Sequence, residues 1–231
     1  MRKRISTGLV LAVLLFLTIS LADAWPLRIG LMLCFGMAMF ELWASATYGM
    51  VAAQKPQGKY PVFLETGVLM IAALSVVLCP IRPTEMLAIA IAAYVTDIAG
   101  YFVGSRLGKT KLKLLEKLSP KKTAEGYIGG LVASWLVTGI FVLVFGGAMS
   151  IVPKVGLVLF GGIVGSAGDL LGSAAKRELG IKDADEITRN MPIAKHLERL
   201  MAGHGGYLDR FDSLGLVMVF YYFLLLISGA L

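Results

Sequence analysis

The sequence is poor in charge: only 16% of its 231 residues are Asp, Glu, Lys or Arg, whereas soluble domains carry about 25%. Hydrophobic residues instead make up 57% of the chain. This composition excludes a soluble globular protein and predicts an all-α integral membrane protein with one polytopic membrane domain over residues 1–231. A helical crossing needs roughly 20 apolar residues, so the chain has room for at most about eight spans.

Cysteine is also scarce, and the glycine-rich nucleotide-binding signatures of soluble enzymes are missing. Cys34 and Cys79 lack any paired spacing, which excludes a disulfide framework and a thiolate metal site. No Walker A loop or Rossmann fingerprint occurs, so no soluble nucleotide-binding fold is implied. The net charge of +7 does not indicate a nucleic-acid partner, because excess Lys and Arg in a membrane protein marks cytoplasmic loops and contacts with membrane lipids.

Seven apolar runs predict seven transmembrane helices, and six to eight fit the sequence within the accuracy of the boundaries. The runs cover residues 5–21, 26–46, 62–79, 84–103, 127–145, 155–171 and 214–231. The first run follows Arg2-Lys3-Arg4 and precedes Ala22-Asp23-Ala24, which also gives it the form of a cleavable signal peptide. Cleavage there leaves the topology of the other spans unchanged.

Basic residues alternate from loop to loop and therefore predict the orientation. Nineteen of the 22 Lys and Arg residues fall in the loops of one side. The positive-inside rule places this side, with the N-terminus, in the cytoplasm. Two polar loops, residues 105–126 and 172–212, share that cytoplasmic face.

The first polar loop has the composition of a phosphate-binding segment. It follows Asp97 in the fourth predicted span and ends with the run from Ser119 to Gly126. Glycine lets the backbone approach an anion, Ser and Thr donate hydrogen bonds, and Lys supplies positive charge. By composition alone, a cytoplasmic loop that touches acidic lipid is the favoured alternative.

The second polar loop begins with Asp169 at the end of the sixth predicted span. A carboxylate near membrane depth is costly and usually functional, although pairing with a Lys or Arg from a neighbouring helix is the structural alternative. Asp97 has the same two interpretations, and Glu41 is expected to make a polar contact inside the bundle. Apolar residues at helical spacing predict a short interfacial amphipathic helix within residues 184–203.

Both loops together resemble the CDP-diacylglycerol synthases, also called phosphatidate cytidylyltransferases. The first match is Ser119-Pro120-Lys121-Lys122-Thr123-Ala124-Glu125-Gly126. The second is the series Lys176-Arg177, Lys182-Asp183, His204-Gly205-Gly206 and Asp209-Arg210-Phe211-Asp212. The sequence departs from the family pattern at Gly172, where relatives usually carry an acidic residue, and in the longer segment 184–203.

The resemblance implies a nucleotidyltransferase of phospholipid biosynthesis in a prokaryotic-type inner (plasma) membrane. Its reaction converts CTP and phosphatidic acid to CDP-diacylglycerol and pyrophosphate, with Mg²⁺ and a second metal ion as candidate cofactors. A homodimer is implied in the same way. Because nucleophile, electrophile and leaving group are all anionic, basic residues and metal-held carboxylates are the groups that this chemistry needs.

The matched motifs, together with the acids Asp97 and Asp169 at the start of the two polar loops, supply three groups of candidate residues. The candidate catalytic residues are Lys176, Arg177, Lys182, His204 and Arg210. The candidate substrate-binding residues are Ser119, Lys121, Lys122, Thr123, Glu125, Gly205 and Gly206. The candidate metal ligands are Asp97, Asp169, Asp183, Asp209 and Asp212.

Two other functions stay open at this point. CTP-dependent kinases of membrane polyprenols or phytol-type alcohols resemble the same superfamily, but they generally lack the complete second series. A transporter also fits a chain with several spans and intramembrane acids. Transporter motifs should gather near the midplane, however, whereas most of the polar motifs here lie in the predicted cytoplasmic loops.

Overall fold

The computed structural model describes residues 24–53, 60–79, 81–112, 119, 122–181 and 207–230. These residues form six helices: α2 (Ala24–Ala53), α3 (Tyr60–Leu78), α4 (Pro83–Leu107), α5 (Ala124–Phe145), α6 (Ile151–Glu178) and α9 (Leu208–Ser228). Each helix is long and apolar enough to cross a membrane. The chain is therefore an all-α integral membrane protein, and six of the predicted spans are confirmed. The first predicted span and the predicted amphipathic helix lie outside the described residues.

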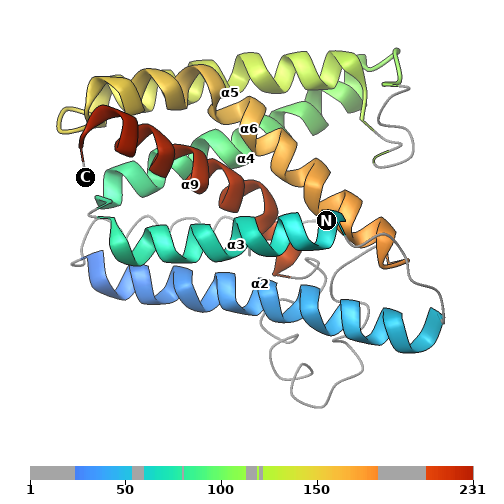
Figure 1. The fold of residues 1–231 in the computed structure, drawn as a ribbon. Helices are drawn as coiled ribbons and strands as arrows, with labels where there is room; N and C mark the ends of the chain where they lie inside the picture. The colour runs from blue at the N-terminus through green and yellow to red at the C-terminus, as the bar shows by residue number, and fades with distance from the viewer. Residues whose placement is uncertain are drawn as a thin grey trace.

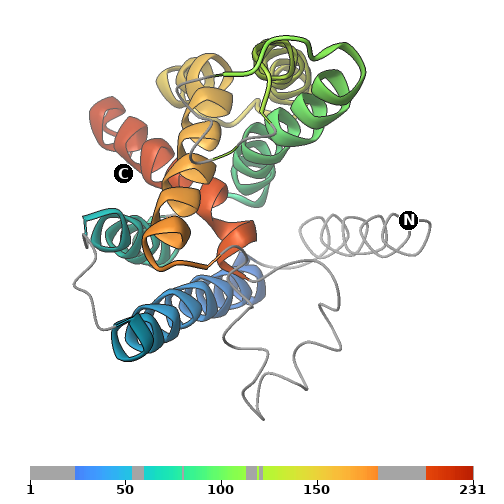
Figure 2. The same ribbon diagram turned by 90° about the vertical axis from the view of Figure 1, so that its right-hand side faces the viewer.

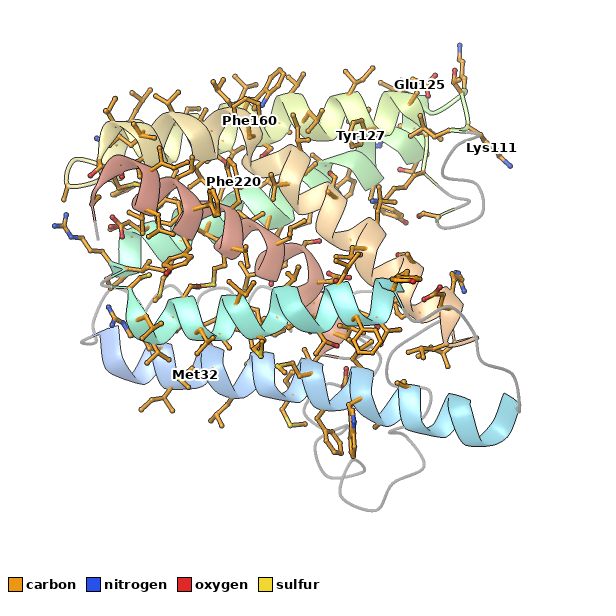
Figure 3. The ribbon with its side chains drawn as sticks, viewed as in Figure 1. Met32, Lys111, Glu125, Tyr127, Phe160 and Phe220 are labelled. Atoms are coloured by element: carbon orange, nitrogen blue, oxygen red, sulfur yellow. The ribbon has the colours of Figure 1, made fainter. Side chains whose placement is uncertain are left out.

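The helices pack as two pairs with two further helices between them. Helices α2 and α3 form one pair, α4 and α5 form the other, and α6 and α9 cross in the middle (Figures 1 and 2). Fully buried aliphatic side chains from both pairs and from the central helices make the core. Large apolar side chains such as Met32 point outward along the bundle (Figure 3), as expected where helices face lipid.

Glycines allow α4 and α5 to pack backbone against backbone. A Cβ atom at Gly126 would stand 2.7 Å from the carbonyl oxygen of Gly100 and 3.0 Å from the Cα of Gly104. Small residues at such a crossing let helices approach closely, which is the usual source of helix association in lipid. The close packing holds the end of α4 against the start of α5, where the first polar loop joins them.

The central crossing of α6 and α9 also depends on a glycine. A Cβ atom at Gly168 would lie 2.6 Å from the backbone oxygen of Asp212 and 2.9 Å from the Cα of Ser213. Farther along the crossing, the rings of Phe160 and Phe220 meet edge to face at 6.4 Å (Figure 3). This packing fixes the start of α9 beside the last turns of α6.

Helix α6 extends farther than its apolar run predicts. The predicted span ends at residue 171, whereas α6 continues to Glu178 and includes Lys176 and Arg177. Basic residues are favourable in the last turn of a helix because they face its negative end. Gly180, with φ of +72°, then ends the helix in a conformation that favours glycine.

The helices therefore enter both predicted polar loops. Residues 105–107 and 124–126 belong to α4 and α5, and residues 172–178 and 208–212 belong to α6 and α9. Helical backbone at these positions fixes the direction of each side chain, so the motif residues within 124–126, 176–177 and 209–212 sit on rigid elements.

Candidate functional site

A cavity of about 520 Å³ with several polar side chains in its wall lies among α4, α5, α6 and the end of the first polar loop. It is lined by Thr96, Asp97, Gly100, Tyr101, Gly104, Ser105, Ser119, Lys122, Thr123, Gly126, Tyr127, Ser166 and Asp169. The volume is in the range of ligand pockets, which usually hold a few converging polar groups. Residues of the first motif region thus meet the two candidate metal ligands Asp97 and Asp169 in one cavity.

Lys122 joins two carboxylates at this cavity. Its Nζ lies 2.6 Å from Oδ2 of Asp169 and 3.8 Å from Oδ1 of Asp97. Asp169 therefore forms an ion pair with a lysine, which is the structural alternative considered from the sequence. It also lines the cavity. The three side chains come from α4, α6 and the segment before α5, and they remain partly accessible.

The Lys122 ammonium stays charged at neutral pH. Burial disfavours its charged form, but the carboxylates of Asp169, Asp97 and Asp212 together outweigh this effect and raise the pKa of Lys122 above its ordinary value. Because the lysine pKa is raised, the contribution of the Lys122 charge to stability is fully present at neutral pH and is lost as the pH rises through that alkaline pKa. The cavity therefore keeps one fixed positive charge between two acids.

A second polar cluster lies farther along α6, towards the C-terminal end of the helix. Lys176 at the end of α6 forms an ion pair with Asp209 in the first turn of α9. Asp212, one turn farther along α9, is 2% exposed, and its Oδ1 accepts a hydrogen bond from the Ser213 backbone N–H at 2.6 Å. These residues all belong to the second predicted motif series.

Ser213 connects the two clusters. Its hydroxyl donates a hydrogen bond of 3.5 Å to Asp97 Oδ2, and its backbone N–H bonds Asp212. The polar groups thus continue from the cavity, past Ser213, to Lys176 and Asp209. Two separate motif regions form one continuous polar site at the same end of the bundle.

Comparisons with known proteins identify the family of the chain. The cytidylyltransferase family matches residues 10–228 of the chain. The chain belongs to the cytidylyltransferase family. Among its relatives, the phosphatidate cytidylyltransferase of Bacillus subtilis (strain 168) is 42% identical over 130 residues, which are 56% of this chain and 43% of that protein.

Two further relatives give the same result. The phosphatidate cytidylyltransferase of Staphylococcus aureus (strain COL) is 36% identical over 125 residues, covering 54% of this chain and 42% of that protein. That of Staphylococcus haemolyticus (strain JCSC1435) is 35% identical over 125 residues, with the same shares. The matched part of the chain thus spans less than half the length of these curated relatives.

The structure describes most of the site residues predicted for this cytidylyltransferase-family chain. Ser119, Lys122 and Thr123 line the cavity, and the Thr123 side chain also caps α5 by accepting a 3.2 Å hydrogen bond from Gly126 N–H. Arg177 and Arg210 are exposed at the same end of the bundle. The remaining predicted residues lie outside the described residues: Lys121, Lys182, Asp183, His204, Gly205 and Gly206.

Glutamates near the site have different local roles. Glu125 accepts backbone hydrogen bonds from Lys109 and Thr110 and does not line the cavity, so it fixes the loop beside the site (Figure 3). Glu41 accepts a 2.9 Å hydrogen bond from Leu208 N–H at the start of α9. The expected polar contact of Glu41 inside the bundle is confirmed.

Sequence reasoning missed two polar residues of the site. Ser213 follows the last motif residue and carries no signal of its own. Glu65 lies within a predicted apolar span, and an acid at such a position is by itself a functional signal. In the structure its side chain is fully buried, within electrostatic range of Asp212 and Lys176.

The arrangement can hold a hard divalent cation only with help from water or substrate. Across the part of the chain that the structure describes, no three Asp, Glu, His or Cys side chains form a metal-binding group. Mg²⁺ in phosphoryl-transfer sites commonly uses one or two carboxylates together with waters and substrate phosphates. Asp97 and Asp169 at the cavity, and Asp212 behind Ser213, offer carboxylates of this kind.

Proposed function

We propose that this chain is a metal-dependent CTP:phosphatidate cytidylyltransferase. The observation that carries the proposal is the cavity in which Asp97, Lys122 and Asp169 meet at one end of a membrane-spanning bundle. A lipid presents its phosphate at the end of such a bundle, and a soluble nucleotide can reach the same end from water. The names of the curated relatives support the same activity.

In the proposed reaction, an oxygen of the phosphatidate phosphate attacks the α-phosphorus of CTP. The bond from that phosphorus to the bridging oxygen of the β-phosphate breaks, and pyrophosphate leaves with the bonding electrons. Lys122 would balance the charge of phosphates in the cavity, and Lys176, Arg177 and Arg210 would hold phosphate oxygens at the other end of the polar site. Such positioning and charge stabilisation are the main sources of catalysis in phosphoryl transfer.

Mg²⁺ fits the residues that are present. Its candidate ligands are Asp97, Asp169, Asp209 and Asp212, and the support is the unpartnered Oδ2 of Asp212 among the described residues. When bound, the metal would neutralise phosphate charge and polarise the attacked phosphorus. Asp209 and Lys176 orient each other, so Asp209 also positions a basic residue for the leaving group.

The test is turnover of the purified chain with CTP labelled at the α-phosphate, phosphatidic acid and Mg²⁺. We expect a labelled nucleotide-linked lipid and release of pyrophosphate, and no labelled lipid when EDTA removes the metal. A polyprenol or phytol-type alcohol is offered in a parallel reaction. Release of CDP with a phosphorylated alcohol, and no labelled lipid from phosphatidic acid, would instead identify a lipid-alcohol kinase.

The proposal includes a cytoplasmic location for the site and for the N-terminus in a bacterial-type inner membrane. Positive-inside asymmetry supports this orientation, and the family resemblance supports a homodimer. We expect a membrane-impermeant maleimide to label Ala148→Cys in intact cells and Lys111→Cys only after permeabilisation, with Cys34 and Cys79 replaced by Ser. Both positions are exposed at opposite ends of the bundle. The reverse labelling pattern would show the opposite orientation.

A further inference from the structure

Glu65 is a buried acid on α3, a helix that contributes no residue to either motif series. Its side chain is fully buried, and among the described residues neither Oε1 nor Oε2 has a hydrogen-bond partner. A buried carboxylate without a donor or counter-charge costs far more free energy than a buried apolar side chain. The Glu65 carboxyl must therefore be neutralised in the working protein, either by a proton or by a bound cation.

Among the described residues, no group donates a hydrogen bond to the Glu65 carboxyl, and the basic residue whose charge acts on it, Lys176, is shared with other acids. A Cβ atom at Gly215 of α9 would lie 3.4 Å from Leu69 Cδ2 and 3.6 Å from Val68 Cγ1 of α3, so the start of α9, with Asp212, packs against the part of α3 that carries Glu65. The Glu65 carboxyl is also within electrostatic range of Asp212, a second buried acid, and of Lys176. The Lys176 ammonium is already hydrogen-bonded to Asp209. Oδ2 of Asp212 is also buried without a partner in the described part of the chain. Two acids from different helices thus present three unpartnered oxygens beside a single lysine.

Gly172 provides the space in which Asp212 can adopt this position. A Cβ atom at Gly172 would lie 2.6 Å from Asp212 Oδ2 and 2.8 Å from its Cβ. Any larger residue would therefore push the Asp212 carboxylate away from α6. The departure from the family pattern at Gly172 leaves this carboxylate packed directly against the helix backbone, where it can be directed towards α3.

We propose that Glu65 is a ligand of a divalent cation that it holds together with Asp212. This inference rests on the proposed metal-dependent cytidylyl transfer and adds a metal ligand from α3. Hard divalent cations bind carboxylate oxygens and complete their coordination with water or phosphate, so two carboxylates are sufficient protein ligands. A bound cation neutralises both buried acids and leaves Lys176 paired with Asp209.

The test is Mn²⁺ binding to the purified full-length chain, measured by electron paramagnetic resonance without CTP or lipid. We expect Glu65→Gln to weaken binding of one Mn²⁺ by about tenfold or more, since loss of a supporting group alone weakens metal sites by 10- to 100-fold. The matched control is Glu85→Gln. Glu85 is a similarly buried glutamate in the first turn of α4, where it accepts a hydrogen bond from the Arg82 backbone N–H.

A second variant keeps the test decisive if Glu65→Gln does not fold. Glu65→Asp keeps the charge but shortens the side chain, so we expect an Mn²⁺ affinity between those of the wild type and of a chain without the ligand. A wild type that binds no Mn²⁺, or an Mn²⁺ isotherm that neither variant changes, would overturn the inference.

These measurements distinguish failure of the proposed role of Glu65 from failure of the proposed cytidylyl transfer. A wild-type chain that makes the labelled lipid while Glu65→Gln binds Mn²⁺ normally refutes the role of Glu65 alone. A chain that makes no labelled lipid but loses Mn²⁺ with Glu65→Gln keeps the cation site and refutes the proposed substrate.

Discussion

Asp169→Asn is expected to lower kcat for cytidylyl transfer by about 10³-fold, because it removes a negative charge from the centre of the polar cavity. Asp169 lines that cavity and pairs with Lys122 at 2.6 Å. Asparagine keeps the shape of the side chain but neither attracts a metal ion nor holds the ammonium by charge. Initial rates with labelled CTP and phosphatidic acid, at several Mg²⁺ concentrations, measure the effect.

The control separates lost chemistry from lost structure. Glu85→Gln makes the same chemical change in a buried acid at the far end of α4, and we expect its rate to stay within about threefold of the wild type. Elution as a single species in detergent and an unchanged melting temperature show that Asp169→Asn is folded. A rate for folded Asp169→Asn close to that of the wild type would remove Asp169 from the catalytic site.

Gly168→Ala is expected to separate α6 from α9 and to damage both stability and activity. The added methyl group would lie 2.6 Å from the backbone oxygen of Asp212 and 2.9 Å from the Cα of Ser213, so a helix must move. Overpacking of this kind typically costs 1–3 kcal/mol. Misplacement of reacting groups by about 1 Å can lower the rate by about 10²-fold. Denaturation midpoints in detergent and initial rates measure the two effects.

Gly139→Ala is the matched control for this substitution. Gly139 also lies inside a spanning helix, but a Cβ atom there would meet only a Val158 methyl at an ordinary 3.8 Å. Alanine is intrinsically more favourable than glycine in a helix by about 1 kcal/mol. We therefore expect this control to be as stable as the wild type or slightly more so. Equal stability and activity of both variants would contradict the close crossing at Gly168.

The spans could be predicted from the sequence because bilayer thickness demands long apolar runs, and such runs need no tertiary information. The ends of the helices were predicted less accurately than the existence of the spans. Helix α6 continues through Lys176 and Arg177, since hydrogen bonding can carry a helix beyond the apolar core and into the headgroup region. A hydropathy boundary therefore marks the edge of the apolar layer and not the last helical residue.

The candidate site was partly predictable. The motifs named Asp97, Lys122 and Asp169, and the structure brings them together, but their pairing depends on how α4, α5 and α6 pack. An acid inside an apolar run marks Glu65 as unusual in the sequence, but its proposed partner, Asp212, follows only from the way α3 packs against α9. The proposed roles of the motif residues in 182–206 stay predictions from the resemblance.

Helix α6 keeps the distance between the two ends of the polar site constant. Asp169 at the cavity and Lys176 beside α9 are seven residues apart on this one helix, or about 10 Å along its axis. A continuous helix is stiff along its axis, so this spacing cannot adapt separately to each substrate. Any tilt of α6 moves both groups together. A ligand that contacts both groups must therefore span about two turns of the helix.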